Sequence, residues 1–159
     1  FKWGLADSSE ATTELHTATH LLLAGLQKYL GKDVHQAGSN ITPERLRFDF
    51  THPEKVTRDI LDDIENYVND IISQDCTMSC EIMPKETARE QGVEGSFWEK
   101  YPDEVKVYTL KNSSGKIFSQ ELCGGPHIEK TSTMGTFKIK KEEASSRGVR
   151  RIKAILIKN

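Results

Sequence analysis

The chain has 159 residues, a formal net charge of −2 and a hydrophobic fraction of 36%, which suits one globular domain with a thin core rather than two independent domains. No apolar run approaches the roughly 18 residues that a membrane-spanning helix needs, and no basic and apolar leader opens the chain, so we expect a cytoplasmic protein without a membrane partner. The three cysteines are an odd number for a disulfide framework and favour a reducing compartment.

Charge is distributed unevenly along the chain. Residues 51–104 carry 5 Lys/Arg against 14 Asp/Glu, whereas residues 138–159 carry 8 against 2. A basic terminal segment on an acidic body can gather a phosphate backbone at one face of the molecule. An ordinary solvated strand and tail would explain the same pattern equally well.

The first predicted element is a long amphipathic helix from about Glu10 to Leu30. Residues 1–13 are expected to form a linker or cap, and Asp7 to Glu10 offers a capping signal, a short acceptor side chain followed three residues later by a carboxylate. Gly31 is a natural stop for this helix. Helical spacing predicts a buried stripe made of Leu15, Ala18, Leu22, Leu26 and Leu30.

The hydrophobic period changes after this helix. Leu46, Phe48 and Phe50 alternate with polar residues, which predicts a half-buried strand, and a preceding strand around residues 35–38 would complete a hairpin. A second long helix is expected from Pro53 to about Ser73, because proline is tolerated in the first turn of a helix.

Shorter elements are predicted in the second half of the chain. The loop at residues 92–102 holds Phe97, Trp98 and Tyr101, which suit a lid, a base-stacking surface or a local core. The segment 112–115 is a hairpin signal. The other predicted elements are a strand at 77–83, a short helix at 84–90, strands on both sides of the hairpin turn, and strands at 134–140 and 148–157.

Two pairs of side chains that can bind metal share one spacing. His16 and His20 are four residues apart on the predicted helix and therefore lie on one face. Cys123 and His127 are also four residues apart, across two glycines and a proline. Together the four supply imidazole and thiolate ligands that suit tetrahedral zinc. The pair of histidines alone would be more typical of ordinary polar residues on a solvated helix face, and the second pair is what favours a metal site.

These ligands permit either a structural or a catalytic zinc site. A structural site closes the coordination sphere with protein ligands, whereas a catalytic site keeps a position for water or substrate, and the sequence does not choose between them. Thr17, Ala18 and Thr19 stand between the histidines, so the glutamate of the HExxH metalloprotease motif is missing. Thr19, Gln36 and Ser39 suit recognition of a small polar substrate, although each also suits ordinary turn or surface chemistry.

Five motifs in the chain, in this order, resemble the editing domain of alanyl-tRNA synthetase and its freestanding trans-editing relatives. Any one motif is weak, but their shared order is highly specific, and the similarity extends from about Glu14 to Ile155. The motifs are residues 16–22, 36–39, 45–50, 123–127 and 148–152.

The resemblance implies a zinc-dependent deacylase. Its substrate would be a mischarged alanine tRNA, in which serine or glycine is esterified to the 3′ end. The implied zinc ligands are His16, His20, Cys123 and His127, and the implied substrate pocket is formed by Thr19, Gln36 and Ser39. From these we take His16, His20, Cys123 and Gln36 as the candidate catalytic residues.

The resemblance also implies an α+β fold, a two-layer domain in which two long helices pack on a curved, largely antiparallel sheet. This agrees with the helices and hairpins predicted above. We expect residues 14–159 to form a single editing domain, either freestanding or a fragment of a longer synthetase. The basic residues expected to contact tRNA are Arg147, Arg150, Arg151 and Lys153.

The residue before His127 departs from the family pattern, which usually has threonine where this chain has Pro126. A Gly-Pro-His ending resembles the related editing domain of threonyl-tRNA synthetase, which removes serine from threonine tRNA. Editing of Ser-tRNA(Thr) is therefore one alternative. A non-catalytic RNA-binding appendage braced by zinc is a second alternative, and a small-molecule zinc hydrolase or lyase is a third.

Overall fold

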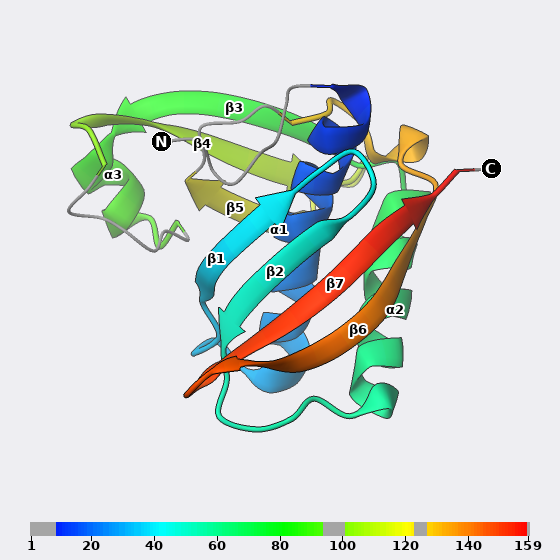
Figure 1. Cartoon of the computed structure of the whole chain (residues 1–159). Helices are drawn as coiled ribbons and strands as arrows, with labels where there is room; N and C mark the ends of the chain where they lie inside the picture. The colour runs from blue at the N-terminus through cyan, green and yellow to red at the C-terminus, as the bar shows by residue number, and fades with distance from the viewer. Residues whose placement is uncertain (1–8, 94–100, 123–126, 159) are drawn as a thin grey trace.

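The computed structural model of the chain describes residues 9–93, 101–122 and 127–158, and Figure 1 shows how its elements are arranged. The predicted α+β class is confirmed, since the helices pack against antiparallel sheets. The elements are α1 (Glu10–Leu30), β1 (Gln36–Ile41), β2 (Leu46–Thr51), α2 (Arg58–Ser73), β3 (Thr77–Pro84), α3 (Lys85–Glu90), β4 (Glu104–Lys111), β5 (Ile117–Leu122), the 3-10 turn η2 (Thr131–Thr133), β6 (Thr136–Ser146) and β7 (Val149–Ile157).

The described strands divide into two antiparallel sheets, where one curved sheet was expected. The order in the larger sheet is β1-β2-β7-β6, and in the smaller sheet it is β3-β4-β5. Helices α1 and α2 lie on one face of the larger sheet, and the smaller sheet lies beside α1 at the upper end of the view (Figure 1). Helix α1 contacts β1 and β2 of one sheet and β5 of the other. It is therefore enclosed on more than one side.

The limits predicted for α1 are confirmed. Ser9 caps its N-terminus by accepting a hydrogen bond from the N–H of Thr12, and the N–H of Gly31 donates to the carbonyl of Gln27 at the other end. Because α1 lies between two sheets, several of its polar residues are buried together with its apolar stripe. The helix also crosses the domain boundary expected between residues 13 and 14.

The main core forms between the larger sheet and the two long helices. Phe48 and Phe50 of β2 pack with Phe137 of β6, while Leu22 of α1 and Ile64 of α2 close the other side. All five of these side chains are at most 1% exposed. A smaller cluster of apolar residues, separate from the main core, joins α3 to β4 and β5.

A β-bulge in β1 changes which of its side chains face the helices. Gln36 pairs with Phe50 and Ser39 pairs with Phe48, and the register shifts between Gln36 and Gly38. Residues three apart in a regular strand point to opposite faces, but here both are paired with inward-facing phenylalanines. The extra residue in the bulge therefore places Gln36 and Ser39 on the same face, the one that α1 covers.

The predicted start of the second helix is wrong. Helix α2 begins at Arg58 rather than Pro53, because Thr57 is in an extended conformation and the N–H of Val56 donates to the Glu142 carboxylate. Arg150 donates to both oxygens of the same carboxylate at 2.8 Å. Burial by itself raises the pKa of Glu142, but the hydrogen bonds from Arg150 and Val56 outweigh it and lower that pKa below its ordinary value of 4.5.

The remaining elements follow the predictions closely. The hairpin turn is confirmed, since Gly115 adopts a φ of 86° between β4 and β5. Strand β6 continues to Ser146, beyond its predicted end, and η2 was not predicted. Phe97 and Trp98 lie outside the described residues. None of the described helices combines the length and apolar character needed to cross a membrane.

Candidate metal centre

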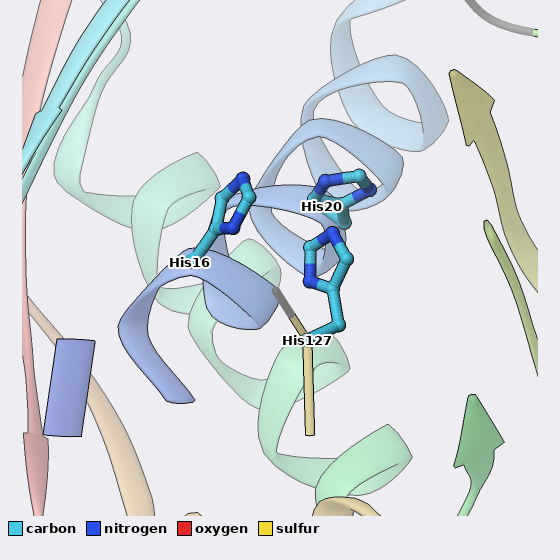
Figure 2. A group of neighbouring side chains, drawn as sticks. All are labelled: His16, His20 and His127. Atoms are coloured by element: carbon cyan, nitrogen blue, oxygen red, sulfur yellow. The ribbon is translucent and has the colours of Figure 1, made fainter. Parts of the chain in front are cut away.

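Three histidines converge beside α1. His16 and His20 lie one turn apart on the helix, and His127 follows β5 in the chain. Their candidate ligand atoms all lie within 4.8 Å of one another, and Figure 2 shows the three rings gathered in one place. His16 is 3% exposed and His20 is 6% exposed. The structure thus brings together three of the four predicted ligands, while Cys123 lies outside the described residues.

The environment of His127 suits a neutral metal ligand. Burial, followed by the nearby His20 and His16, lowers the pKa of His127 well below its ordinary value of 6.5. Its Nε2 atom is buried and has no hydrogen-bond partner among the described residues. A buried imidazole nitrogen without a hydrogen bond is costly unless another group completes its coordination. The residues therefore fit a metal ion.

Thr17 fixes the orientation of the His127 ring. Its hydroxyl donates to the backbone carbonyl of Thr13 at 3.1 Å and lies 3.1 Å from Nδ1 of His127. When the single hydroxyl proton is donated to Thr13, the Thr17 oxygen accepts from Nδ1, an arrangement that places the ring proton on that nitrogen. The lone pair is then on Nε2, the atom that has no described partner. The N–H of Ile128 donates to the same hydroxyl at 3.3 Å.

Glu121 contacts the ring of His20 in the way that Thr17 contacts the ring of His127. Oε2 of Glu121 lies 2.6 Å from Nδ1 of His20, and the same oxygen accepts a hydrogen bond from Ser119 at 2.8 Å. Glu121 is only 8% exposed. A carboxylate in contact with one ring nitrogen favours a proton there and leaves the other nitrogen to a metal, as in many histidine sites.

Glu121 was not among the residues predicted from the sequence. Its signal was present, because it stands two residues before Cys123 at the end of a predicted strand. Residues two apart in a regular strand share a face, so this spacing could have marked Glu121 as a candidate partner of the predicted ligands.

The predicted substrate residues lie on the elements that surround the histidines. Gln36 donates through Nε2 to Oγ of Ser39 at 3.1 Å, which the bulge in β1 makes possible. Thr19 is 5% exposed, and its hydroxyl donates to the carbonyl of His16 at 2.6 Å. The structure therefore brings Gln36 and Ser39 into one hydrogen-bonded pair and places Thr19 on the helix that carries His16.

An open cavity of about 490 Å³ lies beside His20, one of the three histidines of the candidate metal centre. His20 and Glu121 form part of its wall, together with Ser119 and Gln120 of β5. The cavity extends along α1 toward its C-terminal end. Its more distant wall includes Lys28, Lys32, Arg89 and Phe118.

The basic residues predicted to contact tRNA are largely engaged in ion pairs. Arg150 pairs with Glu142 at 2.8 Å, Arg151 with Asp49 at 2.8 Å and Lys153 with Glu143 at 3.7 Å. Arg147 is exposed next to the turn between β6 and β7. Their role in RNA binding stays a prediction, and two of the four, Arg150 and Arg151, already hold carboxylates with two hydrogen bonds each.

Residues 105–153 match the family model described as the threonyl and alanyl tRNA synthetase second additional domain. The chain is 53% identical over 156 residues to the alanine–tRNA ligase of Treponema denticola, covering 98% of this chain and 25% of that protein. It is 54% identical over 157 residues to the enzyme of Borreliella burgdorferi, with 99% and 26% covered. The chain is an alanyl-tRNA synthetase-related domain.

This alanyl-tRNA synthetase-related domain spans about a quarter of the length of those two relatives. The alanine–tRNA ligase of Thermus thermophilus is 47% identical over 145 residues, or 91% of this chain and 16% of that protein. The family model covers Glu121 and His127 but not α1, which carries His16 and His20. The metal centre therefore joins a helix outside the matched region to a segment inside it.

Proposed function

We propose that this domain hydrolyses the ester bond of mischarged aminoacyl-tRNA, with Ser-tRNA(Ala) or Gly-tRNA(Ala) as substrate and zinc as cofactor. The observation that carries the proposal is the convergence of His16, His20 and His127 within 4.8 Å, in a chain related to alanine–tRNA ligases. Cys123 would supply a thiolate as a further ligand. We also propose that the domain is part of a longer synthetase chain and acts in the cytoplasm.

The donor set determines which metal is expected. Imidazole and thiolate ligands favour zinc over magnesium or calcium, which prefer oxygen. When bound, zinc would polarise an ester carbonyl or lower the pKa of a water molecule. An aminoacyl ester is already activated, so a strong side-chain base between His16 and His20 is not required for its hydrolysis.

The residues of the chain would position both the ligands and the substrate. Glu121 and Thr17 orient the rings of His20 and His127, as their contacts of 2.6 Å and 3.1 Å indicate. Gln36 uses its amide nitrogen in the hydrogen bond to Ser39, which leaves its amide oxygen outside that contact. That oxygen can accept from the hydroxyl of a seryl group or from an attacking water.

The test measures deacylation of Ser-tRNA(Ala) and of Ser-tRNA(Thr) by the parent chain and by His20→Ala and Cys123→Ala variants. The parent is expected to hydrolyse Ser-tRNA(Ala) faster, and each variant is expected to lose activity by about 100-fold or more. A parent that binds zinc and tRNA but hydrolyses neither substrate would support a zinc-braced appendage instead. A preference for Ser-tRNA(Thr) would show that the proposed tRNA identity is wrong.

A further inference from the structure

Cations and aromatic rings alternate next to the distant wall of the cavity, which Lys28 and Phe118 help to form. The Lys116 ammonium lies 5.1 Å from the ring of Phe118, whose centroid is 6.5 Å from that of Tyr67. The Lys28 ammonium lies 5.4 Å from the Tyr67 ring and 5.8 Å from the Tyr29 ring. We call these five residues, Lys28, Tyr29, Tyr67, Lys116 and Phe118, the cation–aromatic strip.

Two residues of the strip line the cavity that His20 also lines. Lys28 and Phe118 line the same cavity as His20 and Glu121. On α1, Lys28 follows His20 by eight residues, which is about 12 Å along the helix axis. If the reacting end of a bound ligand lies at His20, a group further along that ligand, and not the reacting ester, therefore lies beside Lys28.

The charges of the cavity favour an anionic ligand. Its wall includes the cations Lys28, Lys32 and Arg89, whereas Glu121 is its only acidic residue among those described and is already in contact with His20 and Ser119. Lys28, Lys32 and Lys116 form no ion pair with the described residues, in contrast to Arg150 and Arg151. A phosphate can therefore bind these lysines without displacing a protein carboxylate.

The aromatic rings of the strip remain accessible to a ligand. Tyr29 is 41% exposed, and Phe118 and Tyr67 are only partly buried against the core. Burial, followed by the nearby Tyr29 and Asp70, raises the pKa of Tyr67. Asp70, an exposed residue of α2, is therefore a nearby negative charge on that side of the strip.

We propose that the cation–aromatic strip binds the single-stranded 3′ end of an RNA and leads it along α1 to the histidines. A basic groove interleaved with aromatic rings is the arrangement that single-stranded nucleic acids require, because bases stack on the rings and phosphates pair with the cations. Phe118 is the stacking residue at the cavity wall, and Lys28 and Lys32 contact the phosphates. The placement of a reacting ester bond at His20 rests on the proposed function, whereas the binding of RNA to the strip does not.

A binding experiment tests the strip directly. The probe is a fluorescent single-stranded RNA ending in CCA, and its affinity is measured by anisotropy across a range of salt concentrations. Phe118→Leu removes the ring but keeps an apolar side chain, and it is expected to weaken binding about tenfold. Lys28→Gln should also weaken binding and reduce the slope of log affinity against log salt by about 0.7.

Two controls separate binding from folding. Lys138→Gln changes an exposed lysine on β6, outside the cavity, and should leave both affinity and salt slope unchanged. Phe118 packs against the main core, so thermal unfolding of its variant is measured in parallel. Lys28 is exposed, so a loss of affinity in its variant is not explained by misfolding. Unchanged RNA affinity in both strip variants would overturn the inference and would favour a contact with another part of a longer synthetase.

Kinetics with two substrates distinguish this inference from the proposed function. With Ser-tRNA(Ala), Lys28→Gln should raise KM about tenfold and leave kcat unchanged, whereas hydrolysis of 3′-seryladenosine, which lacks upstream phosphates, should be unaffected. If the parent binds the RNA through the strip but deacylates neither substrate, the proposed function fails and the strip stands. If the parent deacylates Ser-tRNA(Ala) and the variant keeps the parent KM, the RNA-binding role of the strip is refuted and the proposed function is not.

Discussion

Replacing Glu121 with glutamine tests whether this carboxylate holds His20 in position for a metal. Oε2 of Glu121 lies 2.6 Å from Nδ1 of His20, and the residue is 8% exposed, so the contact is sheltered from water. Glutamine keeps the shape and can still accept from Ser119, but it removes the negative charge. Polar contacts with a charged partner are roughly twice as strong as neutral ones, so loss of the charge is expected to cost about 1.4 kcal/mol, or a tenfold change in zinc affinity.

The assay is competition for zinc between the protein and a chelator of known affinity. Glu121→Gln is expected to bind zinc about 10 to 100-fold more weakly, the range found when partners of metal-binding histidines are removed. Glu129→Gln serves as the matched control, because Glu129 is exposed and stands two residues after His127. If Glu121→Gln bound zinc as tightly as the parent, the role assigned to this carboxylate would be refuted.

Substitutions at three further positions test the account of the fold and of the second oriented histidine. Glu142→Ala leaves the partly buried Arg150 and the N–H of Val56 without their shared partner and should lower the free energy of unfolding by about 2 kcal/mol in denaturant titrations. Since the pKa of Glu142 is lowered in the folded state, its stabilisation is present above pH 4.5 and lost as pH falls below that value, so a Glu142→Gln variant should lose less stability on acidification. Gly135→Ala should destabilise by roughly 2 kcal/mol or more, because φ is +81° and an added Cβ would lie 2.3 Å from the carbonyl oxygen of Ile157. Thr17→Val should weaken zinc binding about tenfold, because the hydroxyl that orients His127 is lost, and should change the melting temperature by no more than a few degrees. An unchanged free energy of unfolding in Glu142→Ala or Gly135→Ala, or an unchanged zinc affinity in Thr17→Val, would contradict the corresponding contact.

The sequence predicted the elements best where a single local signal dominates. The capping residue, apolar spacing and glycine stop defined α1 from Glu10 to Leu30. Helix α2 was placed too early, because a proline suits a first turn but the N–H of Val56 is bound by Glu142, which is distant in the chain. A contact between residues 86 positions apart leaves no local signal.

The site shows the same limit. The spacing of His16 and His20 was sufficient to predict a shared helix face, and the structure adds His127 to them. Sequence reasoning missed Glu121, because its role depends on β5 lying beside α1. It also could not foresee that a bulge directs Gln36 and Ser39 to one face, since regular alternation separates them.

The most direct test of the central claim is the deacylation rate of Ser-tRNA(Ala) by metal-stripped protein as zinc is added back. The account predicts that activity is absent in the stripped protein and reaches its maximum at one equivalent of zinc, and that His16→Ala and His127→Ala fail to recover it. A rate that is the same before and after the addition of zinc would contradict the assignment of these histidines to a catalytic metal centre.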